Sequence, residues 1–132
     1  MSCLIDTDVC SAFIKGQPKV VNRFFQYGDR LHTSVVTVGE LYSGALRSKA
    51  SPRLLPAITG MLNDLIILDV TLEVAATFGA IRAQLLDQGR HAPDMDALIA
   101  STAIHHGLTL VTHNTADYAN IPGIHLVDWI AS

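Results

Sequence analysis

Five short apolar runs recur along this 132-residue chain, and each is followed by a stretch with a different periodicity. The runs lie at residues 3–5, 31–36, 65–68, 108–112 and 124–127. Between them, apolar side chains recur at spacings of three and four, as at Val74, Phe78 and Ile81, which is typical of one face of a helix. Apolar strands that alternate with helices predict an α/β fold with a mainly parallel central sheet, covered by helices on both faces.

Glycine and proline mark where the predicted helices begin and end. We expect a first helix from Asp6–Asp8 to near Gly16, a second over 19–27, and a third that starts at Thr37 and carries Glu40. Later helices are expected over 54–62, 74–85 and from about 95 to Gly107. The chain has no linker, internal repeat or low-complexity stretch, so we predict a single domain spanning residues 1–132.

The composition excludes several classes of protein. With 49% hydrophobic and 16% charged residues, the chain has enough apolar surface for a well-filled core. No apolar run approaches the roughly 18–20 residues that span a bilayer, and the first residues lack the basic segment of a signal peptide. We therefore expect a cytoplasmic protein without a membrane partner, in which Cys3 and Cys10 are reduced core thiols.

The net charge of −3 is unusual for a protein that binds nucleic acid. All nine Lys and Arg residues lie at or before Arg90, and the acids after that point have no basic residue among them. A basic face beside an acidic pocket is compatible with this distribution, although the sequence does not show which residues share a face. Local basic patches or RNA shape should therefore matter more than bulk attraction.

Acidic residues follow three of the predicted strands. Asp6 ends the first, Glu40 follows the second within the next helix, and Asp117 comes shortly after the fourth. Asp96 begins a helix directly after a loop. Sites in open α/β sheets form beyond the carboxyl ends of the strands, so these four carboxylates are predicted to meet at one edge.

Such a cluster needs compensation for its charge. Two carboxylates about 4 Å apart repel by roughly 4 kcal/mol at an effective dielectric near 20. Either some of them are protonated, or they hold a divalent cation such as Mg²⁺, for which Mn²⁺ is a substitute. The ion could activate water for attack on a phosphodiester. We expect Asp6, Glu40, Asp96 and Asp117 to be both the metal ligands and the catalytic groups.

Each acid also has a purely structural interpretation. Asp6 and Asp8 could cap the first helix, and Asp96 could complement the dipole of its own helix. The segment Thr37-Val38-Gly39-Glu40 matches a capping box, in which the glutamate returns to the amide of the first residue. Asp117 could be an ordinary loop acid. Taken singly, none of these residues establishes a nuclease.

Three segments together resemble the VapC toxins of bacterial VapBC toxin–antitoxin pairs, a branch of the PIN-domain family. They are Leu-Ile-Asp-Thr-Asp at 4–8, Thr-Val-Gly-Glu-Leu at 37–41, and Asp-Ala-Leu-Ile-Ala at 96–100 with the segment 107–118. The ending Ile121-Pro122-Gly123 with Trp129 is also similar to these toxins. The resemblance covers essentially the whole chain.

The resemblance implies a PIN-domain-like three-layer α/β/α sandwich. It places Asp6, Glu40 and Asp96 at the three principal acidic positions of the family, and Asp117 at the more variable fourth. Two further polar positions match, Thr112 and Asn114, which would orient ligands and water or simply form loop hydrogen bonds. One departure is Asp8, where the family often has Asn; it would add a ligand or preserve a hydrogen-bonding cap.

For function, the resemblance implies a Mg²⁺- or Mn²⁺-dependent endoribonuclease that hydrolyses RNA phosphodiester bonds, the toxin of a type II toxin–antitoxin module. The implied partners are RNA, which is tRNA for some relatives, and a small VapB-type antitoxin whose C-terminal segment covers the active-site groove. A homodimer is also expected. Tyr42, Leu46 and the stripe 54–62 are candidates for these partner surfaces, or else for ordinary core packing.

Two alternative functions remain open at this point. Asp6-Thr7-Asp8-Val9 after a buried strand also resembles the nucleophile motif of haloacid-dehalogenase-type phosphatases, in which Asp6 would attack phosphorus. That chemistry needs a lysine near the later acids, yet the last lysine is Lys49. The other alternative is a non-catalytic PIN-like module that only binds RNA or a protein.

Overall fold

A five-stranded sheet forms the centre of the computed structural model, which describes residues 1–131. The strands are β1 (Cys3–Ile5), β2 (Leu31–Ser34), β3 (Ile66–Leu68), β4 (Thr109–Val111) and β5 (Leu126–Val127). They are arranged in the order β3-β2-β1-β4-β5, and every neighbouring pair is parallel. This confirms the α/β prediction and places β1, the first strand of the chain, in the middle.

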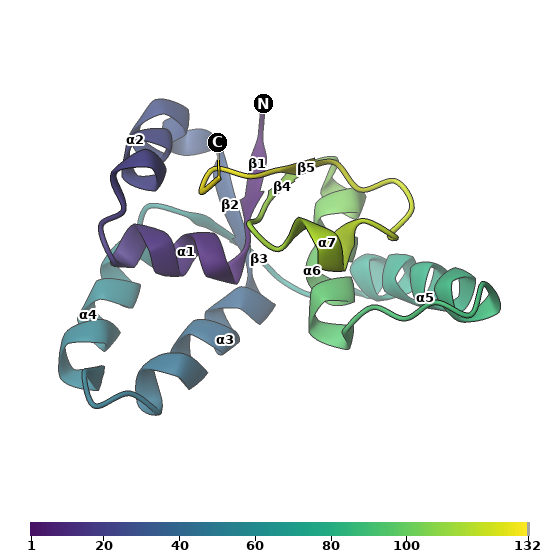
Figure 1. Ribbon diagram of the computed structural model, residues 1–132, viewed down its shortest axis with the longest axis horizontal. Helices are drawn as coiled ribbons and strands as arrows, with labels where there is room; N and C mark the ends of the chain where they lie inside the picture. Colours follow the sequence, from purple (N-terminus) through teal and green to yellow (C-terminus); the bar gives the residue numbers. More distant parts are fainter. Residues whose placement is uncertain (132) are drawn as a thin grey trace.

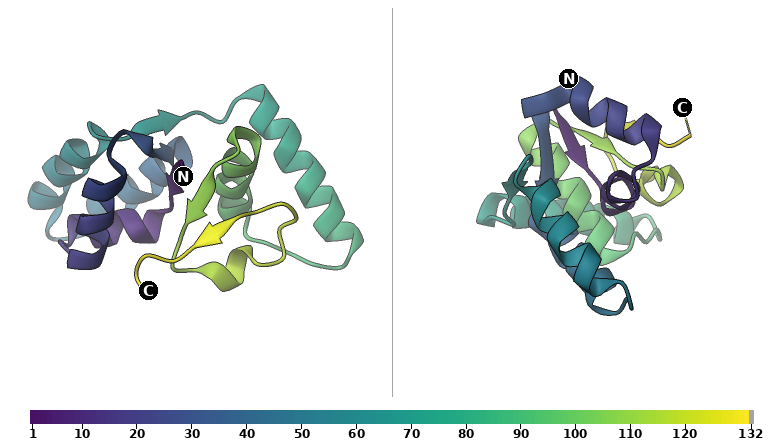
Figure 2. Two further views of the ribbon diagram at one scale, coloured as in Figure 1. Left: turned by 90° about the horizontal axis from the view of Figure 1, so that it is seen from above. Right: turned by 90° about the vertical axis from the view of Figure 1, so that its left-hand side faces the viewer.

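Helices cover both faces of the sheet, as Figure 1 shows. They are α1 (Thr7–Ile14), α2 (Pro18–Tyr27), the short 3₁₀ helix η1 (Gly28–Arg30), α3 (Val35–Leu46), α4 (Ser51–Leu62), α5 (Leu72–Asp87), α6 (Asp94–His106) and α7 (Thr115–Tyr118). Figure 2 shows α5 beside α6 at one end of the molecule, away from α1 and α2. Among residues 1–131, no helix combines the length and the apolar character needed to cross a membrane.

The central strand divides the core into two layers. Because side chains alternate along a strand, Cys3 and Ile5 pack in the cluster that includes residues of α1, α2 and α4. Leu4 points the other way and packs in the cluster that includes residues of α5, α6 and α7. All three side chains are fully buried, and each large one contributes roughly 1.5–3 kcal/mol of burial free energy. The three-layer α/β/α prediction is thereby confirmed.

The boundary between β2 and α3 differs from the prediction. The helix starts at Val35, two residues earlier than expected, and its N-cap is Ser34, whose hydroxyl accepts a hydrogen bond from the backbone N–H of Val36 at 3.1 Å. Thr37 is therefore inside the helix, and the capping-box interpretation of Glu40 is wrong. The β2 strand ends at Ser34, which pairs with Leu68 of β3 and at the same time caps the helix.

The third strand is also placed differently from the expectation of a buried strand. β3 lies at the edge of the sheet, and the side chains of Ile66 and Ile67 are 50% and 42% exposed. An apolar run indicates a strand but not its position in the sheet, since the position depends on which strands pair with it. The prediction of a strand was right, and the prediction of its burial was wrong.

Candidate active site

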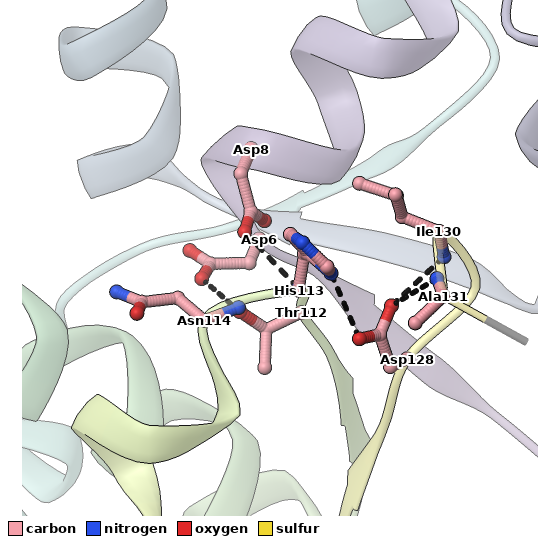
Figure 3. Close-up of polar contacts among 8 residues, drawn as sticks. All are labelled: Asp6, Asp8, Thr112, His113, Asn114, Asp128, Ile130 and Ala131. Carbon is pink, nitrogen blue, oxygen red and sulfur yellow. Dashed lines mark hydrogen bonds and ion pairs between the residues drawn. The ribbon is translucent and has the colours of Figure 1, made fainter.

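The acidic residues gather where β1 and β4 end. Asp6 follows β1 directly, and its backbone N–H donates to the carbonyl of Val111, the last residue of β4, at 2.9 Å. This contact brings the start of α1 beside the loop that follows β4. Figure 3 shows the result, with Asp6 and Asp8 facing Thr112, His113 and Asn114. Residues about a hundred positions apart in the sequence thus form one polar edge.

Asp6 is the most buried acid of the cluster, with 5% of its surface exposed. Its Oδ1 accepts a hydrogen bond from the backbone N–H of Thr7 at 2.8 Å, so the side chain does cap α1. Its Oδ2 accepts from the hydroxyls of Thr112 at 2.8 Å and Tyr118 at 3.0 Å. Oδ1 therefore caps α1, and the hydrogen bonds to Oδ2 fix the carboxylate within the cluster.

Glu40 is linked to the Asp6 segment through a hydroxyl. Thr7, the residue after Asp6, donates a hydrogen bond from its Oγ1 to Oε1 of Glu40 at 2.6 Å. The same Oγ1 lies 3.2 Å from Oγ1 of Thr37, which is fully buried in α3. Glu40 lies one turn further along α3, so α1 and α3 are joined by polar contacts at the site.

Asp96 lies in the first turn of α6, and its Oδ1 is 3.4 Å from the hydroxyl of Tyr118. Burial, followed by the charges of Asp6, Asp117 and Glu40 in that order, raises the pKa of Asp96 to about 6. Those three acids are therefore close enough to act on Asp96 electrostatically. All four predicted carboxylates therefore belong to one cluster.

Asp117 lies on the exposed side of this region, in α7. Its Oδ2 accepts a hydrogen bond from the side-chain amide of Asn114 at 2.6 Å. Asn114 is itself placed by Thr112, whose hydroxyl accepts from its backbone N–H at 3.0 Å. Thr112 and Asn114, both predicted to orient the site, thus lie in contact with Asp6 and Asp117 respectively.

Asp8 lies beside Asp6 but faces a different partner. Its Oδ2 accepts a hydrogen bond from the backbone N–H of His113 at 3.0 Å, whereas its Oδ1 is buried and has no partner within residues 1–131. Burial raises the pKa of Asp8, and the charge of Asp6 adds to the effect. The ring of His113 points away to Asp128, at 2.9 Å.

Two residues of the site were not singled out by sequence analysis, Thr7 and Tyr118. Thr7 lies between Asp6 and Asp8, and only the two aspartates of this motif were considered as functional residues. Tyr118 is fully buried, but the four-residue helix that carries it is too short to show a periodicity. The only signal was its position directly after Asp117.

The donor set fits a hard divalent cation in kind, because every candidate ligand is a carboxylate oxygen. The raised pKa of Asp96 and the orphan oxygen of Asp8 both indicate negative charge without a compensating group. In the part of the chain that the structure describes, no three His, Cys, Asp or Glu side chains are already arranged to hold an ion. Their mutual repulsion opposes closer approach without a cation.

Two grooves meet at Glu40, one on each side of α3. The first, of about 740 Å³, lies between α3 and α6 and includes Val35, Arg47 and Met95. The second, of about 160 Å³, lies between α1, α3 and α4 and includes Lys15 and Ile58. Both are largely apolar, and each has one basic residue on its wall. The site is thus open to extended ligands from two directions.

A comparison with protein families matches residues 3–123 to the PIN domain. Among curated proteins, the chain is 35% identical to the tRNA(fMet)-specific endonuclease VapC of Salmonella typhimurium over 127 residues, which cover 96% of each chain. It is 34% identical to the ribonuclease VapC2 of Haemophilus influenzae, with 96% of this chain and 97% of that protein covered.

Solved structures give the same result. The fold matches the DNA-bound VapBC complex of Salmonella typhimurium with a TM-score of 0.92 and 35% identity, over 98% of both chains. It matches VapBC2 of Rickettsia felis, bound to a DNA fragment from its promoter, with a TM-score of 0.91 and 27% identity over 98% and 99%. The resemblance found in three sequence motifs therefore extends through the fold.

Proposed function

The chain belongs to the PIN-domain family, in its VapC ribonuclease branch, and on this basis we propose that it is a metal-dependent endoribonuclease. The observation that carries the proposal is the convergence of four carboxylates. Asp96 is influenced by the charges of Asp6, Glu40 and Asp117, and its pKa is raised to about 6. Such an arrangement costs folding free energy and is typical of functional sites.

The chain's own residues fix the ligand oxygens before any substrate binds. Thr112 and Tyr118 hold Asp6, Thr7 holds Glu40, and Asn114 holds Asp117. A Mg²⁺ or Mn²⁺ ion held by Asp6, Glu40, Asp96 and Asp117 would supply a water of lowered pKa and offset the charge of the phosphate. These four acids are at once ligands and catalytic groups in this proposal, with Asp8 as an additional acid beside them.

The buried setting of Asp6 argues against the phosphatase alternative. In that chemistry Asp6 would attack phosphorus beside a charge-neutralising lysine, whereas Asp6 is 5% exposed and the last lysine of the chain is Lys49. Membership of the PIN family also favours hydrolysis by water over a covalent intermediate.

For the substrate, we propose RNA and, more specifically, a transfer RNA. The Salmonella typhimurium relative is a tRNA(fMet)-specific endonuclease and shares 35% of its residues with this chain. Because the net charge is −3, the groove between α1, α3 and α4 beside Glu40, with Lys15 on its wall, is the surface that would contact the RNA backbone. Such an enzyme would act in the cytoplasm.

We further propose that a VapB-type antitoxin neutralises this protein, because the matched structures are of VapBC complexes. The groove between α1, α3 and α4 leads to Glu40 and would bind the C-terminal segment of the antitoxin. Of the predicted partner surface, Leu46 is 68% exposed, whereas Ile58 within the stripe 54–62 is 2% exposed. Tyr42 is half-buried against the core, so Leu46 is the stronger candidate for contact.

A homodimer is the remaining proposal. The groove between α3 and α6 has exposed apolar residues, Val35 at 39% and Met95 at 54%. A second copy seated there would cover them. We expect light scattering to give twice the mass calculated for the 14.2 kDa chain, and Met95→Glu to give the single mass.

The direct test is cleavage of an RNA panel with Mg²⁺ or Mn²⁺. We expect cleavage by the wild type and none after chelation of the metal. The Asp6→Asn and Asp96→Asn proteins should bind RNA but not cut it, and the induced wild type, unlike Asp6→Asn, should arrest growth. Sequencing RNA ends after brief induction would identify the cleavage site.

Two results would contradict the proposal. Binding of RNA without cleavage of any substrate would favour the non-catalytic binding module. Cleavage that survives chelation would rule out metal dependence while leaving the ribonuclease assignment intact.

A further inference from the structure

Tyr118 places a single hydroxyl between the two acids at the buried end of the site. The residue is fully buried, and its ring packs in the same core cluster as Leu4, Ile99 and Leu110. Its hydroxyl lies 3.0 Å from Oδ2 of Asp6 and 3.4 Å from Oδ1 of Asp96. Because the ring is held by packing, the position of this hydroxyl is fixed by the core.

The hydrogen bonds to Asp6 determine which of its oxygens remains available. An ionised carboxylate has about four lone-pair positions, two on each oxygen. Within the described residues, Oδ2 accepts from both Thr112 and Tyr118, whereas Oδ1 accepts only from the N–H of Thr7. Oδ2 is therefore saturated, and Oδ1 is the oxygen with a free position for a ligand.

We propose that Tyr118 is a positioning residue, which directs the free oxygen of Asp6 toward the cation. The inference rests on the proposed metal dependence. Outer-shell hydrogen bonds of this kind orient ligating carboxylates and prevent them from rotating. The hydroxyl has a single proton, so its hydrogen bond is the 3.0 Å contact to Asp6, and the 3.4 Å contact to Asp96 is the weaker of the two.

Tyr118→Phe tests this role, because it removes the hydroxyl and keeps the ring. We expect calorimetric titration of metal-free protein with Mn²⁺ to give an affinity about 10-fold weaker than that of the wild type. Tyr27→Phe is the matched control. The ring of Tyr27 also packs against a core aromatic, Trp129, and its hydroxyl forms no hydrogen bond within residues 1–131. It should leave Mn²⁺ affinity unchanged.

The metal dependence of cleavage distinguishes a positioning role of Tyr118 from a role in stability alone. If Tyr118 positions the ligands, the Mn²⁺ concentration for half-maximal cleavage rises about 10-fold and excess Mn²⁺ restores most of the rate. A loss of rate that excess Mn²⁺ does not restore would overturn the inference. So would equal Mn²⁺ affinities of the wild type and Tyr118→Phe, which would leave the proposed ribonuclease function standing.

A structure of the wild type with Mn²⁺ provides a test that does not depend on the variant folding. We expect the ion on Oδ1 of Asp6, with the Tyr118 hydroxyl still bonded to Oδ2. An ion on Oδ2 that displaces the hydroxyl would overturn the inference. Failure of the wild type to bind Mn²⁺ at all would overturn both the inference and the metal dependence on which it rests.

Discussion

Asp6 and Asp117 belong to the same carboxylate cluster, but the molecule holds them in opposite ways. Asp6 is almost fully buried and accepts hydrogen bonds from three different residues, two of them far away in the sequence. Asp117 is exposed and is held by Asn114, three residues before it. One acid is fixed by the tertiary structure, and the other by a local turn.

This difference predicts how strongly function depends on each position. A buried carboxylate with several donors has one orientation, and its loss leaves those donors without a partner. An exposed carboxylate on a short helix adapts its position, and water replaces its partner at small cost. Substitutions on the buried side of the cluster, at Asp6 and its partners, should therefore reduce ion affinity and turnover strongly. Substitutions on the exposed side, at Asp117, should reduce them less.

The largest effect is expected for Asp6→Asn. The amide keeps the shape of the side chain but removes the charge, so the cleavage rate should fall by at least about 100-fold, beyond the effect typical of outer-shell groups. Cleavage of a labelled tRNA measures the change. RNA binding should stay close to wild type, and a thermal melt checks that the variant is folded at the assay temperature; a rate within 10-fold of wild type would remove Asp6 from the site.

Thr7→Val tests the support of the buried side. The variant removes the hydroxyl that donates to Glu40 at 2.6 Å and keeps the branched side chain. We expect a loss of about 10–100-fold in kcat at fixed Mn²⁺, because Glu40 loses its orientation. Thr59→Val, on the exposed face of α4, is the control and should leave kcat unchanged. Equal rates for both variants would show that Glu40 needs no such link.

Asp117→Asn should have a smaller effect than either change on the buried side. The residue is exposed, and Asn is able to keep the contact with Asn114, so a loss of about 10-fold or less is expected. The same tRNA cleavage assay provides the measurement. A loss as large as that of Asp6→Asn would break the distinction between the two sides.

Asp96→Asn should stabilise the metal-free protein at neutral pH. The pKa of Asp96 is raised from 3.8 to about 6, so its favourable contribution is complete below 3.8 and is lost as the pH rises through 6. At pH 7.5 the variant should gain about 1 kcal/mol, a value reduced because the group is only half-buried, or roughly 4 °C in Tm.

Thermal unfolding at two pH values provides the check. The gain should shrink toward zero at pH 4 and should reverse when Mg²⁺ is added to the wild type. Asp94→Asn, in the same turn but in an exposed ion pair with Arg82 at 3.4 Å, is the control and should not stabilise the protein. Equal melting temperatures of wild type and Asp96→Asn at pH 7.5 would argue that the cluster carries no uncompensated charge.

The same two sides differ in how far sequence could predict them. That acids follow three of the strands is visible in the alternation of apolar and polar residues, and this placed Asp6, Glu40 and Asp117 at one edge, joined by Asp96 at the start of a helix. The contacts of Asp6 with Thr112 and Tyr118 were beyond reach, because they span 106 and 112 residues. For Glu40, the local sequence also matched a capping box, and this interpretation fails because the helix begins at Val35.

The central position of β1 also determines when, during synthesis of the chain, the site can assemble. Asp6 is synthesised 112 residues before Tyr118, whose hydroxyl donates to it. The strand that precedes Asp6, β1, pairs with its second neighbour only after β4 has been synthesised. A nascent chain that has not yet been extended through β4 and α7 therefore lacks the assembled site, and a cell that synthesises this protein meets its activity only after both elements have been made.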